Sequence, residues 1–191
     1  MVEPSAKRAV VVMGVSGSGK TTMGQALAQG LGWAFVDADD LHPAANRSKM
    51  AGGQPLSDAD RAPWLDQVAA YIAGAGAGTG VVVACSALKR AYRERLRVAD
   101  PALALVYLNP PAAVLAERLA RRRGHFMPPG LLGSQLATLE PPEADEAPIT
   151  VPSDLEMTDQ LEAVLRALVL SPAGSAPGPG RPRAAERPSR P

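Results

Sequence analysis

Gly14-Val15-Ser16-Gly17-Ser18-Gly19-Lys20-Thr21 matches the pattern G-x-x-x-x-G-K-[ST] of a phosphate-binding loop. The loop follows the apolar run Ala9–Met13 and precedes helical sequence that begins near Lys20, which is the strand-loop-helix context that the motif requires. Its glycines allow backbone N–H groups to wrap closely around phosphate oxygens. We expect Lys20 to bridge the β- and γ-phosphates of a nucleotide and the Thr21 hydroxyl to ligate magnesium.

The predicted nucleotide contacts lie in this loop and in the first turn of the helix that follows it. They are Gly14, Val15, Ser16, Gly17, Ser18, Gly19, Lys20, Thr21 and Thr22. The alternative is a glycine-rich turn that binds nothing, and the complete motif in its strand-helix context argues against it.

Outward from the loop, the chain alternates between short apolar runs and stretches with helical periodicity. This alternation predicts a parallel sheet covered by helices, because unbroken apolar runs are typical of strands buried on both faces. We therefore expect an α/β fold of three layers around a five-stranded parallel sheet. The predicted strands are Ala9–Val15, Trp33–Asp37, Val81–Cys85, Leu103–Asn109 and Ile149–Val151, and the predicted helices are Lys20–Leu31, Asp58–Ala73, Leu88–Val98 and Pro111–Arg123.

Composition limits the possible partners. Twenty basic and nineteen acidic residues give a net charge of +1, so no overall field would draw the protein to nucleic acid or to an anionic membrane. No apolar run reaches the roughly 18 residues of a membrane span. The single cysteine, Cys85, cannot form an internal disulfide, which fits a reducing cytoplasm.

The sequence changes character after residue 170. Residues 171–191 contain six prolines, three glycines, four arginines and no aliphatic residue larger than alanine. Such a segment has little apolar surface to bury, so we expect a folded domain over residues 1–170 and a disordered tail over residues 171–191. A solubilising extension is the simpler function for the tail, and a basic docking arm is the alternative.

Other motifs narrow the class of nucleotide-binding protein. The guanine-reading Asn-Lys-x-Asp and the switch Asp-x-x-Gly of regulatory GTPases do not occur in the sequence. One apolar run ends in carboxylates, and Asp37 and Asp39 point the same way from the end of that strand. Asp37 beside magnesium and Asp39 beside an acceptor hydroxyl, as a catalytic residue, would suit a small-molecule kinase. The alternative is that these acids solvate the strand end or cap the next helix.

Four blocks of sequence carry a resemblance to a known family. They are MGVSGSGKTT, DADDLHPAANRSKMAGGQPLSDADRAPWL, VVACSALKRAYRERLR and RLARRRGHFMPPGLLGSQLATLEPPEADE, in this order between about Val10 and Thr150. The chain resembles the small P-loop gluconokinases, which are related in architecture to shikimate kinase and the nucleoside monophosphate kinases. The resemblance implies a P-loop kinase fold, transfer of the γ-phosphate of ATP to the 6-hydroxyl of D-gluconate with Mg²⁺, and a cytoplasmic homodimer.

Polar side chains in these blocks are candidates for the acceptor site. Asp39 is the candidate base or orienting group for the attacking hydroxyl. His42, Arg61 and Arg90 are expected to hold a small polyhydroxy acid, because a guanidinium can form a bidentate contact with a carboxylate. Ser86 is expected to donate to a substrate hydroxyl or a metal-bound water, or instead to cap the helix that follows.

A basic helix runs into a loop rich in glycine and proline, and this arrangement resembles the lid of the related kinases. The lid is predicted over residues 122–130 and as mobile, so that it closes over the triphosphate and excludes water. By this resemblance Arg118 stacks on adenine, Arg122 contacts phosphate as a catalytic residue, and His125 lies near the substrate.

Two other functions stay open at this point. One is a kinase for another small acceptor, such as shikimate or a nucleoside monophosphate. The other is a binding module that uses ATP only as a switch. An assay with ATP and a panel of sugar acids separates them, because only a kinase makes ADP in proportion to one acceptor.

Overall fold

The computed structural model describes residues 9–75, 80–121, 130–152 and 155–170. Within them, five parallel strands form one sheet in the order β2-β3-β1-β4-β5, which confirms the predicted sheet. The strands are β1 (Ala9–Met13), β2 (Ala34–Asp37), β3 (Val81–Ala84), β4 (Ala104–Leu108) and β5 (Ile149–Val151). The central strand β1 therefore leads directly into the phosphate-binding loop.

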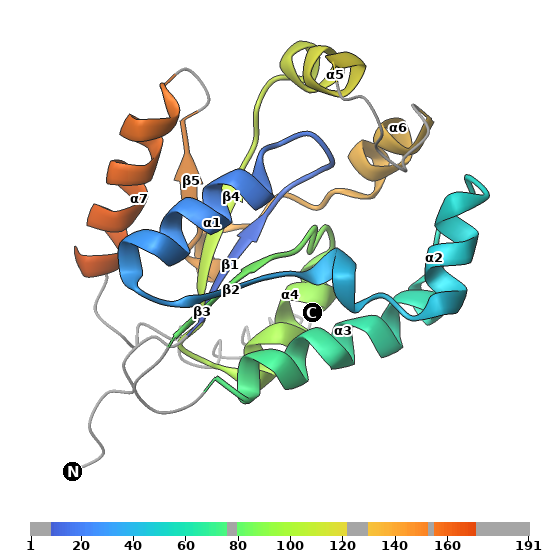
Figure 1. Ribbon diagram of the computed structural model, residues 1–191, viewed down its shortest axis with the longest axis horizontal. Helices are drawn as coiled ribbons and strands as arrows, with labels where there is room; N and C mark the ends of the chain where they lie inside the picture. Colours follow the sequence, from blue (N-terminus) through green and yellow to red (C-terminus); the bar gives the residue numbers. More distant parts are fainter. Residues whose placement is uncertain (1–8, 76–79, 122–129, 153–154, 171–191) are drawn as a thin grey trace, which may run out of the picture.

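Helices cover both faces of the sheet, which confirms the three-layer α/β prediction (Figure 1). They are α1 (Lys20–Leu31), α2 (Ala44–Ala51), α3 (Asp58–Ala73), α4 (Arg90–Ala99), α5 (Ala112–Arg121), α6 (Gly130–Thr138) and α7 (Met157–Leu170), with the 3-10 helices η1 (Ala38–Leu41) and η2 (Ala144–Glu146). Val10 and Val12 of β1 belong to the apolar core beneath α1 and α7. Val11 and Met13 belong to the core beneath α3 and α4, because successive side chains of a strand point to opposite faces.

Several predicted boundaries differ from the structure by one or two residues, and two of these differences have a local cause. The first strand ends at Met13 rather than Val15, because Gly14 has a φ of 145° and begins the loop. The helix predicted from Leu88 begins at Arg90, with Lys89 as its N-cap residue. The reason is that Lys89 is extended, with φ of −101° and ψ of 149°, and follows Ala87, which adopts a left-handed φ of 43°.

Three of the helices, α2, α6 and α7, were not predicted from the sequence. In α2 only Asn46 is buried, so the sequence carries no apolar stripe that would mark a helix. In α7 the signal is present, because Leu161, Val164, Leu165 and Leu168 recur at helical spacing and pack against the sheet.

The remaining elements gather beside the carboxyl ends of the strands. Figure 1 shows α5 and α6 beyond the loop that joins β1 to α1, with α2 standing to one side of α6. Among the helices of the described residues, none has both the length and the apolar character of a membrane span. The predicted lid residues 122–129 and the predicted tail 171–191 lie outside the described residues.

Candidate active site

The loop between β1 and α1 has the backbone of a phosphate cradle. Gly14, Gly17 and Gly19 have φ values of 145°, 84° and 98°, which side chains rarely allow. A Cβ on Gly14 would lie 2.5 Å from the carbonyl oxygen of Leu108, so only glycine fits where the loop passes β4. The N-terminus of α1 therefore opens onto a loop whose shape depends on the glycines of the motif.

Lys20 and Thr21 begin α1 on the inner side of this loop. The Lys20 ammonium donates to the carbonyl oxygen of Val15 at 3.1 Å, which holds its charge over the loop. The Thr21 hydroxyl donates to Asp37 Oδ2 at 2.8 Å, so the structure brings together the two residues predicted as metal ligands. Both contribute oxygen atoms, the ligand type that Mg²⁺ prefers.

Asp37 also organises the end of β2. Its Oδ1 accepts a 3.1 Å hydrogen bond from the Asp39 backbone N–H and caps η1, so the capping role that the sequence left open is present as well. Trp64 on α3 donates from Nε1 to the carbonyl oxygen of Ala38 at 2.6 Å and so holds η1 against α3. The Asp39 side chain is 61% exposed and faces outward from this anchored turn.

The His42 side chain is buried next to Asp39 rather than exposed to solvent. It is only 5% exposed and stacks on the Trp64 ring, with centroids 4.2 Å apart and planes inclined by 14°. Burial, followed by the charges of Arg61 and Arg47, lowers the pKa of His42 to about 4, so the imidazole is neutral near pH 7. His42 Nε2 lies 4.0 Å from Asp39 Oδ1.

Arg61 on α3 lies with Lys89 and Tyr92 around a single carboxylate, that of Asp58. Lys89 donates to both oxygens of Asp58, at 2.7 and 2.9 Å, and the Tyr92 hydroxyl donates to the same group. These bonds, with that of Lys89 the largest cause, lower the pKa of the Asp58 carboxyl. Arg61 reaches Asp58 only at 3.8 Å and the Tyr92 hydroxyl at 3.5 Å, so its guanidinium is held loosely.

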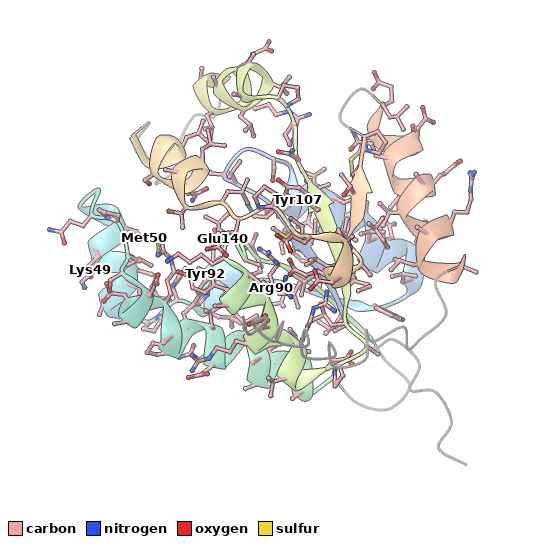
Figure 2. The ribbon with its side chains drawn as sticks, turned by 180° about the vertical axis from the view of Figure 1, so that it is seen from behind. Lys49, Met50, Arg90, Tyr92, Tyr107 and Glu140 are labelled. Carbon is pink, nitrogen blue, oxygen red and sulfur yellow. The ribbon has the colours of Figure 1, made fainter. Side chains whose placement is uncertain are left out.

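Arg90 is held much more tightly. Its guanidinium pairs with Asp145, with Glu94 at 3.0 Å and with Glu143 at 3.4 Å, and the hydrogen bonds to Asp145 are the largest cause of its raised pKa. The Arg90 backbone N–H donates to Glu140 at 2.7 Å, and Figure 2 shows the two residues as neighbours. A substrate carboxylate would have to displace these acids, so the structure favours Arg61 over Arg90 as the carboxylate-binding residue.

Ser86 follows β3 at the carboxyl edge of the sheet. Its carbonyl oxygen accepts from the Gly14 backbone N–H at 3.4 Å, which places the residue beside the phosphate loop. The alternative role, capping a helix at Leu88, is wrong because α4 begins at Arg90 with Lys89 as its N-cap. Neighbouring Cys85 is fully buried, and burial raises the pKa of its thiol to about 12, which makes it a poor nucleophile.

A buried ion pair supports the loop that carries Ser86. Arg93 and Glu146 are 2% and 5% exposed, and two hydrogen bonds of 2.6 and 2.7 Å join them side by side. Arg93 also donates to the carbonyl oxygens of Ala87, Leu88 and Glu140. One arginine therefore ties the β3–α4 loop to the segment that follows α6.

A small pocket opens on the other side of the phosphate loop. Arg118 on α5 donates to the Ser18 carbonyl oxygen at 3.3 Å and lines this pocket with Ser18, Asn109, Pro152 and Gln160. The buried Ser18 hydroxyl has no hydrogen-bond partner within the described part of the chain. The predicted adenine-stacking residue thus lines an opening next to the loop, whereas Arg122 and His125 lie outside the described residues.

Two residues at this edge were not singled out in the sequence. Gln135 on α6 accepts a 2.6 Å hydrogen bond from the Ser16 backbone N–H of the phosphate loop. Asn46 on α2 is buried and lies 3.4 Å from His42 Nδ1. No spacing rule connects residues 119 positions apart, so Gln135 was not recognisable from sequence alone. Asn46 was not recognisable either, because its burial depends on how α2 packs.

Comparisons with known proteins show the family of this chain. A family described as an AAA domain matches residues 10–142. Gluconokinase from Gluconobacter oxydans is 52% identical over 160 residues, covering 83% of this chain and 90% of the relative. The crystal structure of a gluconokinase from Sinorhizobium meliloti superposes with a TM-score of 0.77 at 44% identity, covering 86% of this chain and 93% of the other. A sugar kinase from Janibacter superposes with a TM-score of 0.81 at 45% identity, covering 87% and 97%. With this identity over most of both chains, and with the phosphate loop facing Asp37 and Asp39, the chain belongs to the gluconokinase family.

Proposed function

We propose that this protein transfers the γ-phosphate of ATP to the 6-hydroxyl of D-gluconate. The observation that carries the proposal is the 2.8 Å contact between Thr21 and Asp37, which joins the phosphate loop to the strand end that bears Asp39. Relatives named gluconokinase, at 41 to 52% identity, support gluconate as the acceptor. The acceptor oxygen bonds to the γ-phosphorus as the bond to the β,γ-bridging oxygen breaks, and ADP leaves.

The phosphate loop binds the triphosphate and orients it. Its backbone N–H groups and the N-terminus of α1 direct positive partial charge at the phosphate oxygens. Lys20 moves from the Val15 carbonyl oxygen to the β- and γ-phosphates, where its charge stabilises the transferring group. The contacts proposed for Gly14 to Thr22 follow from this geometry.

Thr21 and Asp37 would hold Mg²⁺. Their adjacent oxygens fit a hard cation that keeps several water and phosphate ligands, and no group of three or more His, Cys, Asp or Glu side chains among the described residues competes for it. Bound there, the ion would neutralise charge on the β- and γ-phosphates.

Asp39 orients the acceptor hydroxyl and accepts its proton, directly or through water. Arg61 binds the gluconate carboxylate, because its guanidinium has only long contacts with Asp58 and Tyr92. Ser86 hydrogen-bonds to a substrate hydroxyl. Arg90 remains a weaker candidate, since three carboxylates hold it.

The nucleotide base and the lid complete the proposal. Arg118 stacks on adenine in the pocket beside Ser18 and Pro152. Arg122 and His125 lie outside the described residues, and for them we propose contacts with phosphate and with the acceptor. We further propose a kinase domain over residues 1–170 and a cytoplasmic homodimer.

A coupled assay for ADP release tests the function. Purified protein is supplied with ATP and Mg²⁺ and with one acceptor, which is D-gluconate, an epimer of D-gluconate, glucose, shikimate or AMP. A further reaction receives no acceptor. We expect ADP in proportion to gluconate and a product with phosphate on O6. Equal ADP release with and without acceptors would support the switch module instead, and a preference for shikimate or AMP would contradict gluconate as the substrate.

A further inference from the structure

We propose that Asn46 and His42 act as positioning residues that fix the carboxylate of Asp39 for the acceptor hydroxyl. The inference rests on the proposed function of Asp39, but it assigns Asn46 a role and gives His42 a different one from direct contact with the substrate. The three side chains come from η1, from the turn after it and from α2.

The hydrogen bonds of Asn46 decide which ring nitrogen of His42 carries the proton. Asn46 Nδ2 lies 2.8 Å from the backbone carbonyl oxygen of Asp60, which can only accept, so this amide atom is the nitrogen. The same nitrogen lies 3.4 Å from His42 Nδ1 and offers it the second N–H. Nδ1 therefore accepts, and the proton of the neutral ring is on Nε2.

The Nε2–H group faces Asp39. His42 and Asp39 are three residues apart in a 3-10 turn, where side chains at this spacing lie one above the other. Nε2 is 4.0 Å from Asp39 Oδ1, and a small rotation of the exposed carboxylate converts this approach into a hydrogen bond. Catalytic hydrogen bonds commonly shorten in this way when the reactive complex forms.

The imidazole itself has little freedom to turn. It is buried against the Trp64 ring, and Trp64 is fixed by its hydrogen bond to the Ala38 carbonyl oxygen. The charged groups around the ring are Arg61 and Arg47, which together with burial keep it neutral, and Asp39 on its Nε2 side.

A neutral donor has a chemical advantage at this position. A cation in contact with Asp39 would stabilise the carboxylate and weaken it as a proton acceptor. The neutral Nε2–H can hold one carboxylate oxygen in place without forming an ion pair, and this fixes the orientation of the carboxylate toward the acceptor. Orientation of a reacting group to within about 1 Å is worth up to about 10²-fold in rate.

The first test determines the tautomer of His42 by NMR, without an activity measurement. In ¹⁵N-labelled protein at pH 7, the nitrogen shifts of His42, assigned by its loss in His42→Asn, should show a protonated Nε2 and an unprotonated Nδ1. Asn46→Ala should mix the two tautomers, whereas Ser48→Ala, an exposed position on the same helix, should leave the spectrum unchanged. An Nδ1–H tautomer in the wild-type protein would overturn the proposal.

The second test measures coupling to Asp39. An asparagine at position 42 places its amide near Nδ1, whereas a glutamine can place an N–H near Nε2. We expect His42→Asn and Asn46→Ala to lower kcat about tenfold with little change in KM for ATP, and His42→Gln to restore most of the rate. In the Asp39→Asn background the same changes should have little further effect, because residues that act as a unit are not additive.

The outcomes separate this proposal from the proposed function. An additive loss in the double variants, or no rescue by His42→Gln in a folded protein, overturns the positioning role while gluconate phosphorylation by the wild-type protein still stands. Failure of the wild-type protein to phosphorylate gluconate overturns the function whatever tautomer is observed.

Discussion

Thr21 at the start of α1 donates a 2.8 Å hydrogen bond to Asp37 at the end of β2, and the second oxygen of Asp37 accepts from the Asp39 backbone N–H. One carboxylate thereby joins the phosphate loop to the turn that presents the proposed acceptor group. Phosphoryl transfer depends mainly on positioning and on charge stabilisation. The Asp37 carboxylate therefore fixes the position of the proposed acceptor group relative to the phosphate loop.

Asp37→Asn should raise the Mg²⁺ concentration needed for the half-maximal rate. The amide keeps the size of the side chain but loses the negative charge that a cation prefers. The measurement is a Mg²⁺ titration of the kinase reaction at saturating ATP and gluconate. Asp40→Asn, on the exposed neighbour, serves as the matched control and should titrate like the wild-type protein. An unchanged titration for Asp37→Asn would remove Asp37 from the metal site.

Lys20→Ala should abolish transfer and leave the fold intact. The ammonium donates to the Val15 carbonyl oxygen of the loop at 3.1 Å, and its proposed role is to stabilise the γ-phosphate. We expect less than about a tenth of the wild-type kcat, an effect larger than about 1.4 kcal/mol, at an unchanged melting temperature. Retention of more activity than this by a folded variant contradicts the assignment.

Arg61→Gln should raise KM for gluconate more than it changes KM for ATP, because the proposed contact is with the acceptor carboxylate. Arg90→Gln is the matched control, since its guanidinium is held by Asp145, Glu94 and Glu143. Losing a charge-assisted hydrogen bond is worth about 1.5–3 kcal/mol, or roughly 10- to 150-fold in kcat/KM. If Arg90→Gln has the larger effect on KM for gluconate, the choice between the two arginines is reversed.

Asp39→Asn should lower kcat far more than it weakens ATP binding. The substitution keeps the size of the side chain and removes the charge that accepts or orients the hydroxyl proton. General-base assistance is typically worth about 10²–10⁴-fold, so steady-state kinetics with gluconate should show a fall of this order. A smaller fall together with a raised KM for gluconate would make Asp39 a positioning group. Wild-type kinetics would remove it from the site.

Glu146→Gln should destabilise the fold by about 3–5 kcal/mol at pH 7, because it breaks a buried pair and leaves Arg93 without its counter-charge. Burial, the largest single cause, raises the pKa of Glu146, but the hydrogen bonds from Arg93 and the Glu143 backbone together with the charges of Arg93 and Arg90 hold that pKa below its usual value. The carboxylate therefore contributes stability above its unfolded pKa of about 4.3, and this contribution is lost as the pH falls through the lower folded pKa.

Urea unfolding of wild-type and Glu146→Gln protein over this pH range checks the prediction. The difference in unfolding free energy should shrink in acid. Glu162→Gln, at an exposed and distant pair with Arg166, should change stability by less than about 0.5 kcal/mol. A Glu146→Gln effect of that small size would contradict the structural role of the buried pair.

Much of the fold could be read from local sequence. The strands are continuous apolar runs, and the glycines of the phosphate loop are required by backbone conformation, so both are visible without knowing what they touch. The acidic end of β2 was also readable, but the expected strand alternation of Asp37 and Asp39 was wrong, because β2 ends at Asp37 and Asp39 lies in η1. Helix α2 was not readable, because its one buried side chain is the polar Asn46.

The strands, the phosphate loop and the position of the acidic strand end follow from local sequence, since each depends on residues close together in the chain. Packing between distant elements sets which of two similar arginines is held by acids and which is loosely paired, because Arg90 meets Asp145 across 55 positions and Arg61 competes with Lys89 for Asp58. The same holds for the protonated nitrogen of His42. That choice depends on the Asp60 carbonyl oxygen, which directs the Asn46 amide from a different helix. Such contacts form only when distant elements pack together, and no local pattern records them.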